Sequence, residues 1–470
     1  MEILGVRTER VWLELDESSD QRSNRVDLLT GPNGSGKSEI LSFLANTFRK
    51  PKSRPEKGQI SWKYKGFHLI EDGGINPYEP TRVIAQTYSP FNRFPPPIDH
   101  DSSLTSLYSE GDASDSIYIC AGLHKSTRLV SSSLSKNTLE QAIYRLSESL
   151  ESVSSILRVM TNLGLLDRIY FTYEARIGLR SIIDANRKGQ LTEYLEGRKR
   201  YADRQKINRS GLDKELTKVS VTDLAALITE SMKIIGIDIE SRSIRHGIGS
   251  IKSSGRYDFA IFQSLSLLRR LDLLMLRKCE LTTLEGNEFD VADASSGQQQ
   301  MLCSVIGLAT ALKNGSLVLI DEPELSLHPR WQQLYLENLF ATLEPFHSCH
   351  ILIATHSPLI VQRGQALGAG ITQVMRKAVS QSVGQDVTSV EATLQDVFNT
   401  PVFKSVHLAN EIFSLITDGE AGSKSARQSS LAELEKLRKL YADNDFPDDK
   451  SLALISDAID LLSMDMEKDA

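Results

Sequence analysis

Short apolar runs set between polar segments are the first pattern along this chain. They open the stretches RVDLLTGPNGSGKS, LVLIDEP and HILIATHSP, which start at Arg25, Leu317 and His350. Strands buried on both faces of a parallel sheet carry such continuous apolar runs. The first run also leads through a glycine-rich turn into an amphipathic helix. The pattern therefore predicts an α/β core.

Between the first two runs, apolar residues recur at alternating spacings of four and three, the seam spacing of a coiled coil. These residues are Leu139, Ile143, Leu146, Leu150, Val153, Leu157 and Met160. Asn137 and Glu140 resemble a capping box at the start, and Gly164 ends the run. Three heptads are too few for a long arm, so we predict a compact helical insertion over residues 131–287. A second helix around residues 259–278, apolar nearly all round, is expected to pack against the first.

Composition places the chain among globular proteins that are large enough for two or three domains. Its 470 residues are 40% hydrophobic and 24% charged. The net charge of −7 argues against a chain that coats nucleic acid through its overall field, but it leaves a local basic face open. The four cysteines form no C-x-x-C pair, which fits a reducing compartment. No apolar stretch is long enough to cross a bilayer, so we expect a cytoplasmic protein without a membrane partner.

A phosphate-binding loop is predicted directly after the first run, where the residues match G-x-x-x-x-G-K-[ST]. Glycines let backbone N–H groups surround phosphate oxygens, and the helix N-terminus adds partial positive charge. Lys37 would reach the terminal phosphates, and Ser38 would hold Mg²⁺. The predicted nucleotide-binding residues are Gly31, Pro32, Asn33, Gly34, Ser35, Gly36, Lys37 and Ser38.

Two carboxylates follow the second apolar run. A buried parallel strand would present Asp321 and Glu322 at its carboxyl end, where ligands bind in open α/β sheets. We predict that Asp321 binds Mg²⁺ together with Ser38, and that Glu322 is the general base that polarises the attacking water. The third run ends in Thr-His-Ser, and its His356 is a candidate to hydrogen-bond a γ-phosphate oxygen.

In this order, the P-loop, an S-x-G-Q element, a strand ending in Asp-Glu-Pro and a strand ending in Thr-His-Ser resemble the ATP-binding-cassette ATPase superfamily. Its signature motif is matched by Ser295, Ser296, Gly297 and Gln298, with Ala294 where leucine is usual. The resemblance implies an ATPase head with a mixed sheet and flanking helices, ATP and Mg²⁺ as cofactors, and hydrolysis to ADP and phosphate. It also implies that the signature serves ATP on a second head. The same residues fit a plain N-cap before the helix QQQMLCSVIGLATAL.

The superfamily also has a glutamine that contacts Mg²⁺ between the P-loop and the insertion, and Gln86 is the candidate here. The segments SPFNRFP, DEPELSLHP and THSPLIV resemble ATPases grouped with the overcoming-lysogenization-defect and RecF-like proteins. Among these, the stand-alone ATPases of anti-phage systems such as Septu are the most similar. The resemblance covers residues 1–129 and 288–375.

A basic run, EGRKRYADRQKINR, lies inside the insertion. Its charged residues are Arg198, Lys199, Arg200, Arg204, Lys206 and Arg209. We interpret the run as a solvated helix face, and contact with DNA or RNA is the open alternative.

The end of the chain is predicted to be helical and to pack on the core or on another subunit. Its apolar side carries Leu431, Leu434, Leu437, Leu440 and Tyr441. Asp443 and Asp445 have the spacing of a nuclease D-x-D, but the preceding pattern is helical, which predicts an acidic loop at a helix end. An HNH nuclease is not indicated, because His407 is the only histidine beyond His356.

These patterns predict four segments: an ATPase lobe with the P-loop (1–130), the insertion (131–287), a second ATPase lobe (288–376) and a helical extension (377–470). The predicted function is a regulatory ATPase of a bacterial anti-phage complex. It would pair with itself, as a dimer or larger homo-oligomer, and control a separate nuclease or toxin. The alternative is a RecF-like ATPase of DNA repair or chromosome maintenance. A transporter subunit is the third candidate, although the long insertion and the Leu-His-Pro element weigh against it.

Overall fold

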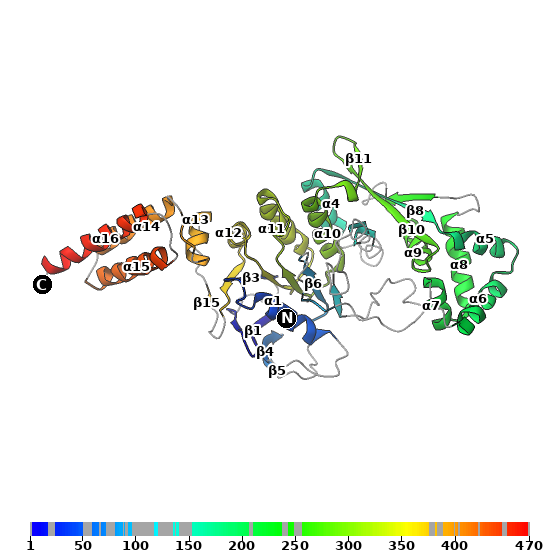
Figure 1. Cartoon of the computed structure of the whole chain (residues 1–470), viewed down its shortest axis with the longest axis horizontal. Coiled ribbons are helices and arrows are strands. Elements are labelled where there is room, and N and C mark those ends of the chain that lie inside the picture. Colours follow the sequence, from blue (N-terminus) through cyan, green and yellow to red (C-terminus); the bar gives the residue numbers. More distant parts are fainter. Residues whose placement is uncertain are drawn as a thin grey trace.

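The structure is a computed structural model. It describes residues 2–16, 24–49, 59–64, 67–71, 80–87, 89, 93–95, 117–120, 135–136, 138–140, 153–205, 210–236, 243–248, 256–375, 381–382, 389–398, 400–402, 405–421, 424–443 and 449–468. Within these ranges the α/β core lies in the middle of an elongated molecule, between the helices of the insertion and those of the C-terminal extension (Figure 1).

The core is a seven-stranded sheet with the order β15-β14-β3-β13-β12-β6-β7. Its strands are β3 (Arg25–Thr30), β6 (Val83–Thr87), β7 (Tyr118–Cys120), β12 (Leu317–Asp321), β13 (His350–Ala354), β14 (Gly370–Gln373) and β15 (Gln381–Ser382). All neighbouring strands are parallel except β15, which pairs antiparallel with β14. The three apolar runs are thus confirmed as strands of one mixed sheet, with β13 between β3 and β12.

Alternate residues of these strands point into two apolar layers. Ile320 and Ile353 face one layer, while Leu319 and Leu352 face the other, as the period of two in a strand requires. The first layer is covered by α10 (Ser296–Ala311), α11 (Pro329–Leu343) and α12 (Pro358–Ala366). The second is covered by α1 (Lys37–Phe48) and by a smaller antiparallel sheet. Burial on both faces explains why the runs are apolar throughout.

The smaller sheet has the order β2-β1-β4-β5. Its strands are β1 (Glu2–Arg7), β2 (Trp12–Glu14), β4 (Gln59–Tyr64) and β5 (Phe67–Glu71). The backbone N–H of Ile3 donates to Nδ1 of His350 at 2.9 Å, and the ring's Nε2 lies 2.8 Å from Oδ2 of Asp27. Burial lowers the pKa of His350, which favours a neutral ring that donates to Asp27. This buried histidine therefore ties the N-terminal strand to the core sheet.

The insertion is not purely helical, and the sequence-based prediction is wrong on this point. Its helices are α4 (Val153–Asn162), α5 (Ile177–Arg187), α6 (Leu191–Gln205), α7 (Gly211–Lys218), α8 (Val221–Ile235) and α9 (Arg256–Arg270). They share the insertion with an antiparallel sheet of the order β11-β10-β8-β9. Those strands are β8 (Leu165–Ala175), β9 (Ser243–Ile248), β10 (Leu274–Thr283) and β11 (Glu288–Asp290), which lies just past the predicted boundary of the insertion at residue 287. The alternating burial along β8 was the missed signal, because a period of two marks a half-buried strand.

The helix predicted over residues 259–278 ends at Arg270, and the chain continues as β10. This helix, α9, packs on α8 and β10. The end of the predicted first helix, α4, packs instead on α10, α11 and β8. Of the predicted seam, Leu139 and Met160 are buried, and the helix stops before Gly164 as expected. Asn137 and the seam residues between 141 and 152 lie outside the described residues. Glu140, the other residue of the predicted capping box, forms an ion pair with Arg269 and accepts from the hydroxyl of Tyr173.

From residue 389 onward the described part of the C-terminal extension is helical, as predicted, whereas β15, at residues 381–382 of the predicted extension, belongs to the core sheet. The helical part comprises α13 (Val390–Ala392), the π-helical turn η4 (Thr393–Val397), α14 (Val406–Ala421), α15 (Lys424–Asp443) and α16 (Asp449–Lys468). The last three helices pack on one another around Leu434, Leu437 and Tyr441, so their apolar faces form a separate small core. Asp443 is the final residue of α15, and Asp445 lies outside the described residues.

Within the described ranges, no helix combines the length and the apolar character that a bilayer-spanning segment requires.

Candidate functional site

The phosphate-binding loop connects β3 to α1 and depends on three glycines with positive φ: Gly31 at 131°, Gly34 at 77° and Gly36 at 110°. Gly36 caps α1, and a Cβ added there would lie 2.2 Å from Cγ2 of Val11. A Cβ on Gly31 would lie 2.6 Å from the carbonyl oxygen of Val374. Both the backbone conformation and the available space therefore require glycine at these two positions.

Lys37 lies at the first position of α1, with its side chain folded back over the loop. Its Nζ donates to the carbonyl oxygens of Gly31 at 2.8 Å and Pro32 at 3.2 Å, and to Oγ of Ser35 at 3.4 Å. Burial lowers the pKa of Lys37 to about 8. Nearby carboxylates oppose this shift, the strongest being that of Asp321. Lys37 is therefore a buried cation that an additional negative charge would stabilise.

Ser38 and Asp321 join two segments that are far apart in the sequence. The hydroxyl of Ser38 donates to Oδ1 of Asp321 at 2.9 Å. Asp321 ends β12, and its register partners are Thr87 and Ala354, so the carboxyl ends of three strands meet at this edge of the sheet. Burial raises the pKa of Asp321 to about 6, although the hydrogen bond from Ser38 lowers it. A hydroxyl and a carboxylate side by side form the oxygen pair that Mg²⁺ prefers.

Glu322 follows Asp321 with an unusual backbone conformation. Its φ is 50°, in the left-handed region that non-glycine residues rarely adopt. The backbone N–H donates to the carbonyl of Ala354 at 2.9 Å, which ties the turn to the neighbouring strand. The left-handed turn lets the adjacent Asp321 and Glu322 line the same cavity. Backbone strain of this kind costs of the order of 1–3 kcal/mol and persists where the surroundings enforce it.

Glu324 is a residue that the sequence analysis missed. Its carboxylate accepts from the backbone N–H of His356 at 2.6 Å and from the hydroxyl of Thr355 at 2.9 Å. Burial raises the pKa of Glu324. The side chain joins the loop after β12 to the loop after β13, so it orients His356 without lining the cavity. The signal was present in the third acidic residue of Asp-Glu-Pro-Glu, but its partners lie in the loop after β13, far away in the sequence.

His356 is half-buried and lines the same cavity as Lys37 and Glu322. Burial lowers its pKa to about 4, and the positive charge of Lys37 adds to this effect. The ring is therefore neutral near pH 7, where one nitrogen donates a hydrogen bond and the other accepts one.

The cavity has a volume of about 250 Å³. Its lining consists of Asn33, Gly34, Gly36, Lys37, Ser38, Glu39, Ser89, Arg93, Asp321, Glu322 and His356. Gly31, Pro32 and Ser35 do not line it, and instead accept the hydrogen bonds of Lys37. Backbone N–H groups at a helix start, a lysine and a hydroxyl–carboxylate pair fit a phosphate chain with Mg²⁺. Glu39 is a lining residue that no sequence motif had singled out, whereas Ser89 and Arg93 belong to the segment SPFNRFP, to which no role had been assigned.

Gln86 does not lie in this cavity, so the structure does not support it as a Mg²⁺ ligand. It is 1% exposed and lies under α10. Its Nε2 donates to the carbonyl of Ser304 at 2.9 Å, and its Oε1 accepts from the hydroxyls of Ser304 at 2.9 Å and Tyr335 at 3.4 Å. The alternation of β6 explains the difference, because the next residue, Thr87, is the register partner of Asp321.

Replacing Gln86 by Leu is expected to lower the free energy of unfolding by about 1–3 kcal/mol, because the buried polar groups around it lose their partner. Chemical denaturation would measure this loss. Nucleotide affinity in the presence of Mg²⁺ should remain within about twofold of wild type. A loss of nucleotide affinity that appears only with Mg²⁺ would instead support Gln86 as a Mg²⁺ ligand.

The signature residues lie apart from the cavity of their own chain. Ser295 caps α10: its hydroxyl accepts from the N–H of Gln298 at 3.3 Å, and the side chain of Gln298 accepts from the N–H of Ser295 at 3.0 Å. Ser295, Ser296 and Gln298 are exposed. A Cβ on Gly297 would lie 2.9 Å from the carbonyl oxygen of Ser326, so the helix passes close to the loop after β12. The exposed N-terminus of α10 thus contributes no residue to the lining of the cavity at its own P-loop.

The lowered pKa of Lys37 predicts a pH dependence of nucleotide binding. A bound phosphate chain would favour protonated Lys37, so binding takes up a proton above about pH 8, where the free side chain is neutral. Affinity for ADP should therefore fall by up to about tenfold per pH unit between about pH 8 and pH 10. Titration calorimetry in buffers of different ionisation enthalpy measures both the affinity and the number of protons taken up on binding. Lys37→Arg is the control, because arginine stays charged and should remove this slope.

A parallel sheet that brings a glycine-rich phosphate loop and an Asp-Glu pair to one cavity defines a P-loop ATPase head. The model of the family described as "AAA domain, putative AbiEii toxin, Type IV TA system" matches residues 123–362, just over half of the chain. The chain belongs to this family. The matched region includes the insertion, the signature, Asp321, Glu322 and His356, and begins after the P-loop.

Among curated proteins, the chain is similar to the "Retron Vc95 probable ATPase" of Vibrio cholerae serotype O1 biovar El Tor. The two are 33% identical over 87 residues. This match covers 16% of this chain and 16% of the relative, so the chain spans only a small part of the length of that protein.

Among solved structures, the similar chains are heads of Smc proteins. One is the head bound to the C-terminal winged-helix domain of ScpA, with 12% identity and a TM-score of 0.31 over 82% of this chain and 97% of that chain. Another is the Smc head of Pyrococcus yayanosii with a coiled coil and joint. It is 12% identical, with a TM-score of 0.29, and the match covers 84% of this chain and 98% of that chain. These scores are too low to carry a structural argument, so the fold class rests on the sheet topology above.

Proposed function

We propose that this chain binds ATP and hydrolyses it to ADP and phosphate with Mg²⁺. The observation that carries the proposal is the contact of Ser38 with Asp321, which joins the P-loop to the Asp-Glu strand at one cavity. A second cavity of about 410 Å³ shares Glu39 and Arg93 with the first and extends to residues 8–10. Together the two hollows offer room for a phosphate chain and a nucleoside.

Each cavity residue has a proposed role. Lys37 binds the terminal phosphates, and Ser38 and Asp321 hold Mg²⁺, whose charge would offset that of the phosphates. Glu322 orients and polarises the attacking water as general base. His356, neutral near pH 7 because its pKa is lowered to about 4, donates a hydrogen bond to the γ-phosphate.

The signature is proposed to act on a second head. Its N-terminal helix end is exposed and carries partial positive charge, while none of its residues lines the cavity of its own chain. Two heads in a symmetric pair would each complete the other's site, so ATP would hold the pair together and hydrolysis would release it.

We further propose that the paired heads regulate a separate nuclease or toxin in a bacterial anti-phage system. The family description names a toxin–antitoxin system, and the curated relative is a retron ATPase. The described tail supports a separate effector, because Asp443 ends a helix rather than following a strand. Septu is one candidate system of this kind.

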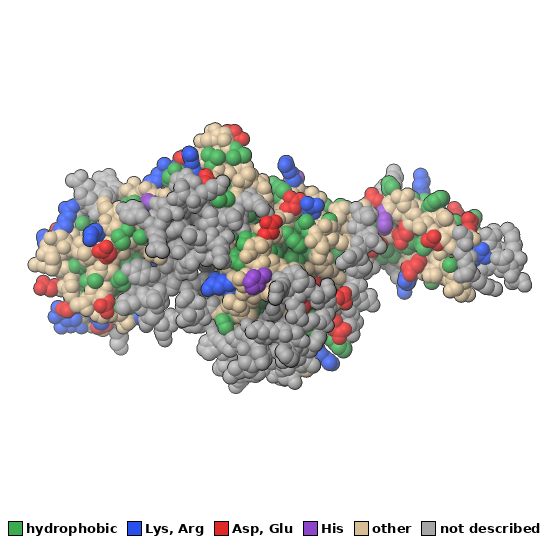
Figure 2. All heavy atoms as spheres, turned by 180° about the vertical axis from the view of Figure 1, so that it is seen from behind, with side chains coloured by type: hydrophobic (Ala, Val, Ile, Leu, Met, Phe, Trp, Pro, Cys, Tyr) green, Lys and Arg blue, Asp and Glu red, His purple; other side chains and the backbone are tan. Residues whose placement is uncertain are grey.

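The DNA-repair alternative depended on the basic run of the insertion. Arg198 is already paired there: its Nε donates to Oδ1 of Asp213 at 2.7 Å, and Asp213 also closes the capping box of α7 with Ser210. On the face in Figure 2, the Lys and Arg side chains of the described surface are interspersed with Asp and Glu. Neither observation favours a DNA-binding strip, and Lys206 and Arg209 lie outside the described residues.

The test is to isolate tagged Glu322→Gln protein from its native host with ATP present and to identify bound molecules by mass spectrometry. A nuclease or toxin that is retained by Glu322→Gln and absent from Lys37→Ala supports the regulatory role. Recovery of DNA or repair proteins alone rejects it in favour of the RecF-like function. The ATPase proposal is checked separately by phosphate release from the purified wild-type chain.

A further inference from the structure

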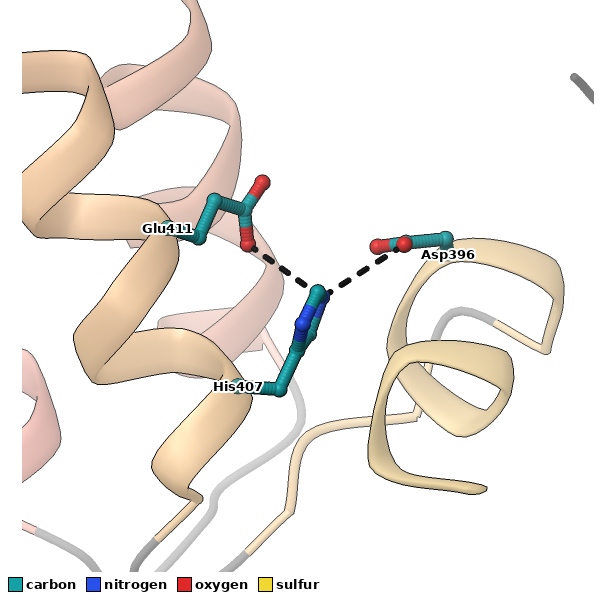
Figure 3. A group of neighbouring side chains, drawn as sticks. All are labelled: Asp396, His407 and Glu411. Carbon is teal, nitrogen blue, oxygen red and sulfur yellow. Dashed lines mark ion pairs between the residues drawn. The ribbon is translucent and has the colours of Figure 1, made fainter. Parts of the chain in front are cut away.

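A group of three side chains in the C-terminal extension lies outside the ATPase site. Asp396 comes from η4, and His407 and Glu411 come from the first two turns of α14. Nε2 of His407 lies 3.6 Å from Oδ2 of Asp396 and 3.8 Å from Oε2 of Glu411. Figure 3 shows both carboxylates directed at the same edge of the imidazole ring. Among the described residues, this is the one group whose His, Cys, Asp or Glu ligand atoms all lie within 4.8 Å of each other.

Among the residues that the structure describes, none is a hydrogen-bond partner of the ring nitrogen between the two carboxylates. Nε2 of His407 is buried, although the whole side chain is 24% exposed. Its distances to the two oxygens exceed hydrogen-bonding range. They are close to the separation of about 3.3–3.6 Å between ligands of a tetrahedral ion with bonds of about 2.0–2.2 Å. The two distances from Nε2 are thus compatible with three ligand atoms around one small divalent cation.

The carboxylates are held by a buried amide. Nε2 of Gln395 donates to Oε2 of Glu411 at 2.5 Å, and it lies 3.4 Å from Oδ1 of Asp396. Gln395 is 2% exposed, and its Oε1 accepts from the hydroxyl of Tyr441 on α15 at 3.4 Å. Outer hydrogen bonds of this type orient the ligands of metal sites.

The start of α14 is anchored as well. Oε2 of Glu391 accepts from the backbone N–H of His407 at 3.0 Å and from the hydroxyl of Ser405 at 3.0 Å. On the other side, η4 is a π-helical turn, closed by the N–H of Phe398 on the carbonyl of Thr393 at 3.2 Å. Single π turns are rare and occur frequently at functional sites.

We infer that Asp396, His407 and Glu411 form a binding site for a divalent metal ion of the Zn²⁺ type. One imidazole and two carboxylates make a three-ligand set that leaves a fourth tetrahedral position open. The ion would join η4, which packs on α12 of the head, to α14, which packs on α15 and α16. A bound ion would therefore stabilise the packing of the C-terminal helices on the ATPase head.

The electrostatics of the group agree with this inference. Burial raises the pKa of Asp396 and that of Glu411, and the charge of Asp396 raises the latter further, while His407 lowers both. Two carboxylates whose oxygens lie within 4.8 Å of each other are stabilised by a nearby cation. The competing explanation is that His407 contacts the two carboxylates directly, with no metal ion between them.

The experiment is a Zn²⁺ titration of the full chain, freed of metal by chelation and without nucleotide, followed by calorimetry. About one Zn²⁺ per chain should bind, and His407→Ala should weaken binding by at least about tenfold. His347→Ala is the matched control, because His347 is an exposed histidine after α11 and should bind as wild type. Equal affinity in the two variants, or no Zn²⁺ binding by wild type, overturns the inference in favour of a simple ion pair.

Two further measurements distinguish loss of the metal site from misfolding of the variant. Circular dichroism reports whether His407→Ala keeps its helices; if it does not, Gln395→Ala replaces it and should weaken Zn²⁺ binding by about 10- to 100-fold. Zn²⁺ should also raise the Tm of wild type and of His347→Ala, because an ion that binds only the folded state stabilises it. A Tm that does not respond to Zn²⁺ in any variant contradicts the site.

Discussion

Glu322→Gln is expected to lower steady-state ATP hydrolysis by about 10²- to 10⁴-fold while leaving ATP affinity within a few-fold of wild type. The amide keeps the size of the side chain beside Lys37 and Asp321, but it cannot accept the proton of the attacking water. ATP should accumulate in the protein, and the paired state should become the dominant species. Phosphate release measures the rate, and light scattering with ATP measures the pairing.

Glu337→Gln is the control for this prediction, since Glu337 lies on α11 in a half-exposed pair with Arg363, 2.6 Å from Nη2. It should hydrolyse ATP within about twofold of wild type, because such pairs contribute little. Hydrolysis at the wild-type rate by Glu322→Gln would remove Glu322 as general base and leave the neighbouring Glu324 to be examined.

Mixing two inactive variants should restore part of the activity. Ser295→Arg has an intact P-loop but places a charged side chain on the exposed end of α10, and Lys37→Ala has an intact signature but lacks the phosphate-binding cation. A mixed pair then contains one complete site and one dead site. With random pairing at equal amounts, phosphate release should reach about a quarter of the wild-type rate, because half of the pairs are mixed.

The control for the mixture is a chain that carries both changes, which should stay inactive with Lys37→Ala at every ratio. Ser295→Asn is a second control, because asparagine is also a good N-cap for α10. Loss of the cap would lower helix stability by about 0.5–2 kcal/mol, and this variant distinguishes that loss from a loss of phosphate binding. No recovery of activity at any ratio of Ser295→Arg to Lys37→Ala would contradict the sharing of sites between chains.

The elements of the core were predictable because their signals are local. Continuous apolar runs and the glycine pattern marked β3, β12 and β13 and the loop from Gly31 to Gly36. The insertion was predicted less well, because its strands β8 and β10 lie between helices of strong apolar periodicity, and β10 has no regular alternation in burial. Residues 274–278 were assigned to a helix for this reason.

The sequence alone determined which chemistry the site can carry, since lysine, hydroxyl and carboxylates follow recognisable local motifs. Which of these groups meet was decided by the tertiary structure: strand register brings Asp321 to Ser38, turns Gln86 under α10, and lets Glu324 reach the backbone of His356. The same holds for Asp396, which lies on η4 and meets His407 and Glu411 of α14. The physical reason is that side-chain contacts depend on the face each residue takes within its strand or helix and on the order in which the elements pack, and neither is contained in a short stretch of sequence.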